Sequence, residues 1–175
     1  MAAGLSAGTA NAASLDGFYG VNVQQVFNGS PASWTPQLAA MSNGGLQLAR
    51  IDARWADVEP GPPSGGSHSY DWSQYDAMVQ AMAQQGLRWY PIVAYSTSWA
   101  GVIAGDSDSV VAPAHVGDFA AFAAALARRY GRGGTFWAAH SWLPQLTQGR
   151  KRRCARECHL VDQITILCRL QGCEW

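Results

Sequence analysis

The chain has 175 residues, of which 48% are hydrophobic and 11% aromatic, a composition typical of one globular domain with a sizeable core. Its formal net charge is zero at pH 7, which excludes a strongly basic surface for nucleic acid or for an anionic membrane. No apolar run reaches the roughly 20 residues that a membrane span needs. The sequence therefore predicts neither nucleic acid nor a membrane as a partner.

The first segment, residues 1–16, is rich in small residues and carries an A-x-A pattern at Ala10-Asn11-Ala12. That pattern is typical of the end of a secretory signal peptide, although a positively charged start and a convincing apolar stretch are missing. We expect a signal-like or flexible segment over 1–16 and an exported, extracellular protein.

Three expected strands alternate with three expected helices. Runs of β-branched and aromatic residues predict strands at 18–27, 46–55 and 87–96. Proline inside a strand is unusual unless the strand lies at a sheet edge, and Pro91 falls inside the third. The helices are expected to start at Thr35-Pro36, at a capping box formed by Asp71 and Gln74, and near Val116, and each ends at glycine.

Alternation of this kind favours a parallel sheet with helices packed on it. No glycine-rich phosphate fingerprint follows the first strand, where "GVNVQQVFNGS" stands instead, so a nucleotide-binding sheet is disfavoured. In a (β/α)8 barrel the functional groups lie at the carboxyl ends of the strands. Polar and aromatic residues occupy those positions here, and the candidate substrate-binding residues among them are Asn22, Trp55, Glu59, Tyr95 and Trp99, to which the family resemblance described next adds Arg50 inside the second strand.

The segments "FYGVNVQ", "LARIDARWADVEP", "YDWSQYDAMVQAMAQQGLRWYPIVAYSTSWA" and "FAAFAAALARRYG" resemble the first three βα units of a clan A glycoside hydrolase. The resemblance implies an α/β fold, a partial TIM (β/α)8 barrel of about three βα units over 17–148. It also implies hydrolysis of O-glycosidic bonds and a carbohydrate partner, which is an oligosaccharide, a polysaccharide or a glycoside. We expect no cofactor and no metal.

Each candidate residue also has a structural alternative. Arg50 matches an arginine that supports the nucleophile in the family, or it pairs with Asp52 or another carboxylate. Trp55 and Trp99 stack on sugar or pack under loops. Glu59, which precedes Pro60, binds substrate, lies in a solvated loop or is a helix-capping partner.

Two further positions belong to the same comparison. Asn22 binds a hydroxyl or bridges backbone groups at a strand end. Tyr95 lies at the end of the third strand, where many relatives place a histidine.

The resemblance implies two catalytic glutamates, one in an Asn-Glu pair after a fourth strand and one after a seventh, and this chain contains neither. A whole barrel needs about 250 residues, so we expect a barrel truncated before the catalytic Asn-Glu strand. The alternative is a non-catalytic partial barrel with weak carbohydrate binding or with no function of its own. Open sheet edges favour self-association.

The tail, residues 149–175, differs in composition from the rest of the chain. It carries all four cysteines and the only lysine, and its net charge is +3, whereas the preceding residues sum to −3. We expect an unrelated or disordered C-terminal tail, which a frameshift would explain. Its C-x-x-x-C-H run lacks the tighter C-x-x-C spacing usual for zinc.

Overall fold

The computed structural model describes residues 19–144. Ten elements follow one another along the chain: β1 (Gly20–Asn22), η1 (Gln24–Asn28), α1 (Pro31–Asn43), β2 (Leu48–Arg54), α2 (Trp55–Val58), α3 (Ser73–Gln84), β3 (Arg88–Ala94), η2 (Pro113–His115), α4 (Val116–Tyr130) and α5 (Thr135–Ala139). The predicted segments 1–16 and 149–175 lie outside the described residues.

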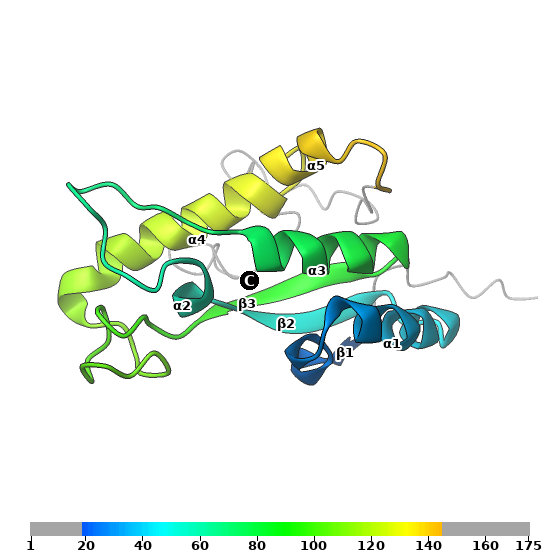
Figure 1. The fold of residues 1–175 in the computed structure, drawn as a ribbon, viewed down its shortest axis with the longest axis horizontal. Coiled ribbons are helices and arrows are strands. Elements are labelled where there is room, and N and C mark those ends of the chain that lie inside the picture. Colours follow the sequence, from blue (N-terminus) through cyan, green and yellow to red (C-terminus); the bar gives the residue numbers. More distant parts are fainter. Residues whose placement is uncertain (1–18, 145–175) are drawn as a thin grey trace, which may run out of the picture.

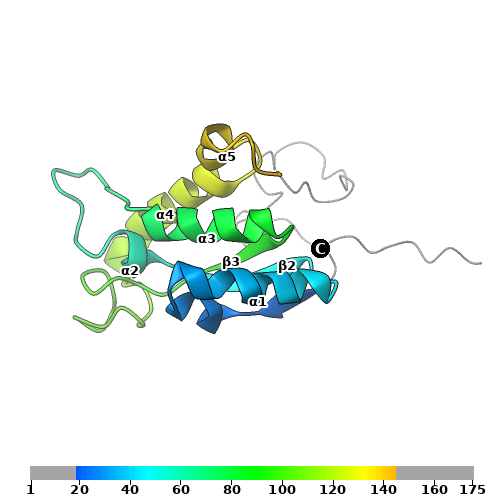
Figure 2. The same cartoon turned by 45° about the vertical axis from the view of Figure 1, so that its right-hand side comes forward.

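The three strands form one parallel sheet in the order β1-β2-β3. Asn22 pairs with Arg50, which in turn pairs with Tyr90. In Figures 1 and 2 helix α3 lies between α1 and α4, and the helices run along the sheet. The predicted α/β fold of three parallel βα units is therefore confirmed.

The two faces of the sheet differ in burial. Ala49, Ile51 and Ala53 alternate along β2 and are buried under the helices. The residues between them are only partly buried, because no element of the described chain covers that face; they are Leu48, Arg50, Asp52 and Arg54. In a closed barrel this second face would be the interior.

The first strand is shorter than predicted. It ends at Asn22, and the chain turns into the 3-10 helix η1, which we had expected to be strand. The side-chain oxygen of Gln24 accepts a hydrogen bond of 2.7 Å from the backbone N–H of Asp52. Phe27 enters the core and packs on Trp34 with ring centroids 4.9 Å apart. Both contacts form because the chain leaves the strand after Asn22 and turns into η1.

Helix α1 begins earlier than the predicted Thr35-Pro36 start. Ser30 is extended and Pro31 takes the first helical position, so Pro36 lies inside the helix. Pro31 is suited to this position because its missing N–H has no partner there in any helix. The earlier start buries Trp34, whose Nε1–H donates to the carbonyl of Gly29 at 3.0 Å.

The predicted capping box at Asp71 and Gln74 is wrong, because α3 begins at Ser73 and its N-cap residue makes no side-chain cap bond. The Asp71 carboxylate instead accepts a bond of 2.9 Å from the backbone N–H of Ser73, a local turn typical of aspartate. One face of this helix enters the core, because Tyr75, Val79 and Met82 are buried.

The remaining predicted elements agree with the structure. Helix α4 runs from Val116 to Tyr130 as expected. Pro91 lies within β3, which is an edge strand of the described sheet, the position in which a strand tolerates proline. Within residues 19–144 no helix is long and apolar enough to cross a membrane.

Candidate functional site

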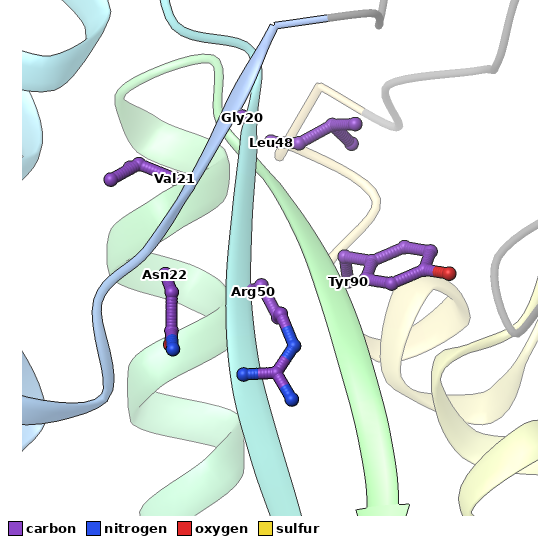
Figure 3. Close-up of a pocket in the computed structure, with 6 residues that line it drawn as sticks. All are labelled: Gly20, Val21, Asn22, Leu48, Arg50 and Tyr90. Carbon is purple, nitrogen blue, oxygen red and sulfur yellow. The ribbon is translucent and has the colours of Figure 1, made fainter.

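Two of the predicted site residues line one cavity on the uncovered face of the sheet. The cavity has a volume of about 290 Å³ and is lined by Gly20, Val21, Asn22, Leu48, Arg50 and Tyr90 (Figure 3). Asn22 is exposed, and the Arg50 side chain keeps 43% of its surface accessible. The Arg50 guanidinium lies 3.7 Å from the Asp52 carboxylate, so the predicted ion pair is present, at long range.

A second group of polar side chains gathers at the carboxyl ends of β2 and β3. Arg54 ends β2, and its guanidinium is hydrogen-bonded to the Asp108 carboxylate from the loop after β3. The guanidinium carbon also lies 5.6 Å from the centroid of the Tyr95 ring, within the range of a cation–π contact. Tyr95 is 41% exposed, so an aromatic surface remains open beside this ion pair.

Two buried polar atoms at the same strand end have no hydrogen-bond partner: Asp52 Oδ1, an acceptor, and Arg54 Nε, a donor. Both residues border a cavity of about 160 Å³ that other polar side chains also line, among them Gln24, Asp57, Gln74 and Tyr75. A hydroxyl group or a water molecule can both donate and accept.

Trp55 and Glu59 do not reach this surface. Trp55 is 0% exposed and packs between Trp99 and Phe122, with ring centroids 4.9 and 6.0 Å away. No ring face remains for a sugar, so the packing alternative holds for Trp55.

Glu59 is also buried, with 3% of its surface exposed. Its carboxylate accepts bonds from Trp55 Nε1–H at 2.9 Å, from His68 Nδ1 at 3.0 Å and from the Ser69 N–H at 3.1 Å. The solvated-loop alternative is wrong for this residue, and its carboxylate lies away from the accessible surface. Glu59 is the C-cap residue of α2, and its backbone N–H donates to the Trp55 carbonyl. A carboxylate with three donors at 3% exposure instead fixes the loop after β2.

Trp99 is half-buried. Its ring meets Trp55 and His115 edge to face, and its Nε1–H points to the Glu59 carbonyl at 3.4 Å. These contacts favour packing under the loop over sugar stacking. Of the six predicted residues, the structure leaves Asn22, Arg50 and Tyr95 accessible.

Sequence reasoning missed His68, Asp108 and Asp118. His68 lies between Glu59 and Asp118, with Nε2 3.4 Å from the second carboxylate, and joins the loop after β2 to α4. Asp108 lies 54 positions from Arg54 along the chain. No local spacing signals either pair, because both form only when loops from different βα units meet.

Tyr70 lies beside this network and its hydroxyl is buried without a hydrogen-bond partner. Burial, with the nearby charge of Glu59, raises the pKa of Tyr70 to about 12. An unfolded tyrosine ionises near pH 10, so between pH 10 and 12 the unfolded chain binds fewer protons than the folded one. Stability is therefore expected to fall over this window.

Urea unfolding at pH 8, 10 and 11 measures this loss. Tyr70→Phe cannot ionise, so its stability should fall less steeply above pH 10 than that of the wild type. An identical slope in the two proteins would contradict the assignment. The pKa values of Tyr75 and Tyr130 are also raised, mainly by burial, so part of the slope should remain in the variant.

The loop after β3, residues 95–112, is packed on itself. Gly101 and Val111 form a β-bridge, and the hydroxyls of Ser96 and Ser109 lie 3.1 Å apart beside Gly101. A Cβ at Gly101 would lie 2.1 Å from Ser109 Oγ and 2.7 Å from Ser96 Oγ. Only glycine fits at the centre of this loop.

Gly101→Ala is therefore expected to destabilise the protein by about 2 kcal/mol, because the added methyl group has no space. Gly117→Ala is the matched control: it lies in α4, a Cβ there meets nothing within 4 Å, and alanine is the better helix former by about 1 kcal/mol. Thermal unfolding of the two variants measures both effects. Equal melting temperatures would contradict the tight packing of the loop.

The chain is a parallel βα protein whose exposed aromatic and polar groups gather where strands end. Residues 17–127 match the family model of glycosyl hydrolase family 14. The chain belongs to this family.

Individual relatives match a shorter stretch. The chain is 33% identical over 81 residues to a beta-amylase of Cytobacillus firmus and to a beta/alpha-amylase of Paenibacillus polymyxa. These matches cover 46% of this chain but 16% and 6% of the respective relatives. The chain thus corresponds to a small part of each relative.

Among solved structures, the catalytic domain of the beta-amylase from Paenibacillus polymyxa is similar with a TM-score of 0.40 and 23% identity. That match covers 59% of this chain and 24% of the other.

Proposed function

We propose that this chain forms part of the wall of a polysaccharide-binding cleft in a glycoside hydrolase of family 14. The observation that carries the proposal is the group at the ends of β2 and β3. There the exposed Tyr95 ring lies beside Arg54, and Asp52, two residues before Arg54 in β2, has a buried Oδ1 that accepts no hydrogen bond. An aromatic ring packs against the apolar face of a pyranose, and the polar atoms bind its hydroxyl groups.

The relatives that match this chain bear the names beta-amylase and beta/alpha-amylase, so short linear fragments of amylose are the ligands to test. We expect maltoheptaose to bind with a Kd on the order of 1 mM, equivalent to about 4 kcal/mol. Isothermal titration calorimetry measures this affinity.

Tyr95→Ala is expected to weaken maltoheptaose binding about fivefold to tenfold, because it removes the aromatic surface. Tyr19→Ala is the matched control. Tyr19 is 58% exposed and precedes β1, which places it at the opposite end of the parallel sheet. Equal losses in the two variants, or no binding by the wild type, would reject the proposal.

Hydrolysis by a glycosidase needs two carboxyl groups on opposite sides of the glycosidic bond. Near the strand ends Glu59 accepts three hydrogen bonds, Asp57 accepts one from Tyr75 and Asp108 is paired with Arg54. We therefore propose that these residues alone do not hydrolyse glucan. The catalytic pair of carboxyl groups is expected in full-length relatives of this chain. Release of reducing sugar from amylose by this chain, abolished in Glu59→Gln, would overturn this proposal.

The non-catalytic alternative predicts association of the chain with itself. In the described sheet β1 and β3 are open edges, and unpaired edge strands favour pairing with another chain. Sedimentation velocity at increasing concentration is expected to show species larger than the monomer. A single monomeric species that melts in one sharp transition would contradict this expectation.

A further inference from the structure

Tyr95 adopts a backbone conformation that tyrosine rarely takes. Its φ is 69°, and among residues 19–144 it is the one non-glycine residue with a positive φ. A left-handed conformation is unfavourable for a bulky side chain and persists where the surroundings fix it. The conformation places the turn at Tyr95 immediately after β3 and leaves the side chain exposed.

The segment that follows Tyr95 is held by hydrogen bonds within the loop itself. The backbone N–H of Ser96 donates to the Ser109 carbonyl at 3.1 Å, and Ser96 is fully buried. Across the loop, the Asp106 carboxylate accepts a bond of 2.8 Å from the backbone N–H of Asp108. The turn and Asp108 therefore belong to one ordered loop.

Arg54 connects this loop to the sheet. Its backbone N–H donates to the Tyr75 hydroxyl at 2.9 Å, so its own position at the end of β2 is fixed. Its guanidinium binds Asp108 and lies over the Tyr95 ring. One cation thus joins β2, the aromatic ring and the loop after β3.

We propose that Arg54, held in place by Asp108, is a positioning residue that fixes the Tyr95 ring as a pre-oriented platform for a pyranose. This inference rests on the proposed function and adds which residues prepare the ring. Arginine suits the task because its planar group stacks on an aromatic ring while it pairs with a carboxylate. A ring fixed before binding loses less rotational freedom when the sugar arrives.

The first test needs no ligand. A guanidinium above a ring experiences its ring current, so the side-chain NMR signals of Arg54 are expected upfield of their ordinary positions. Asp108→Asn should shift them back toward those positions, whereas Asp106→Asn should not. The control removes the same charge from the same loop and keeps an oxygen for the bond from Asp108 N–H. Unchanged Arg54 signals in Asp108→Asn would overturn the inference, whatever the chain binds.

The second test measures maltoheptaose affinity in a double-mutant cycle. Asp108→Asn is expected to weaken binding about three- to tenfold in the wild type and to have no further effect in Tyr95→Ala. An equal loss in both backgrounds would mean that Asp108 acts independently of the ring, which would overturn the inference. The Asp108 side chain is 65% exposed, so the variant should fold.

The two proposals fail in different ways. If the wild-type protein binds no maltoheptaose but shows the Arg54 shift, the proposed function is contradicted. Arg54 then still fixes the Tyr95 ring, but the ring is not a platform for a pyranose. Wild-type protein that binds the sugar while Asp108→Asn changes neither readout leaves the proposed function standing and rejects the role of Arg54.

Discussion

Glu59→Ala is expected to lower the free energy of unfolding by about 3 kcal/mol, because it leaves three donors without their acceptor, one of which, the Trp55 indole N–H, is buried. Each buried donor without a partner costs about 1–3 kcal/mol. Trp55 Nε1–H, His68 Nδ1 and the Ser69 N–H all lose the same carboxylate. Glu59 is 3% exposed and Trp55 0%, so the Trp55 indole N–H is the donor that loses most. Chemical denaturation measures the change.

Glu59→Gln provides the graded comparison. The amide keeps one acceptor oxygen of similar shape, while its NH2 group faces donors. A loss of about 2 kcal/mol is expected, between the wild type and the alanine variant. If both variants unfold at the wild-type midpoint, Glu59 does not hold the loop.

Asp76→Ala is expected to destabilise the protein by about 3 kcal/mol, because Asp76 joins α3 to α4. Its carboxylate binds the Arg129 guanidinium through both oxygens and accepts a bond of 2.7 Å from the Tyr130 hydroxyl. Bidentate pairs of this kind are among the stronger polar contacts. The hydrogen bonds and neighbouring charge of Asp76 also raise the pKa of Arg129.

The matched control is Arg128, the sequence neighbour of Arg129, which is the partner of Asp76. Arg129→Ala should lose much of the same stability, whereas Arg128→Ala removes an exposed arginine and should change the free energy of unfolding by less than about 0.5 kcal/mol. Equal effects at the two arginines would show that Asp76 does not clamp the helices. The helix contact is also expected to show as coupling between Asp76→Ala and Arg129→Ala in a double-mutant cycle.

Local sequence signals predicted the elements of this fold well, since runs of β-branched residues and the glycines that end helices are features of short stretches of chain. The strand at 46–55 and the helix from Val116 to Tyr130 are examples. The errors occur where contacts between residues far apart in the sequence determine where an element begins or ends. Residues 24–28 turn away from the strand because Gln24 bonds to β2, and α1 starts early because Trp34 enters the core.

The candidate site was predicted less completely. Tyr95 could be located because it follows a strand, but nothing in the neighbouring residues signals that Arg54 and Asp108 meet beside it. For Trp55 the packing alternative holds, whereas Glu59 was placed on the right loop and is buried rather than solvated. Residue type and position along the strand do not reveal whether a side chain points to solvent or under a loop.

Pro91 also bears on how the chain behaves at high concentration. In β2 the carbonyl of Arg50 and the N–H of Asp52 both turn toward the β1 side, to Val23 and Gln24. Along a strand of a parallel sheet, the backbone N–H and C=O groups of successive residues point alternately to one neighbouring strand and to the other, so those of Ile51 point to β3. Pro91 is the register partner of Ile51, and its backbone nitrogen therefore points away from β2, to the open edge of the sheet. A strand added at this edge meets a position without a donor. Association can then stop at small assemblies, because the continuous ladder of an amyloid-like fibre is interrupted in the middle of β3.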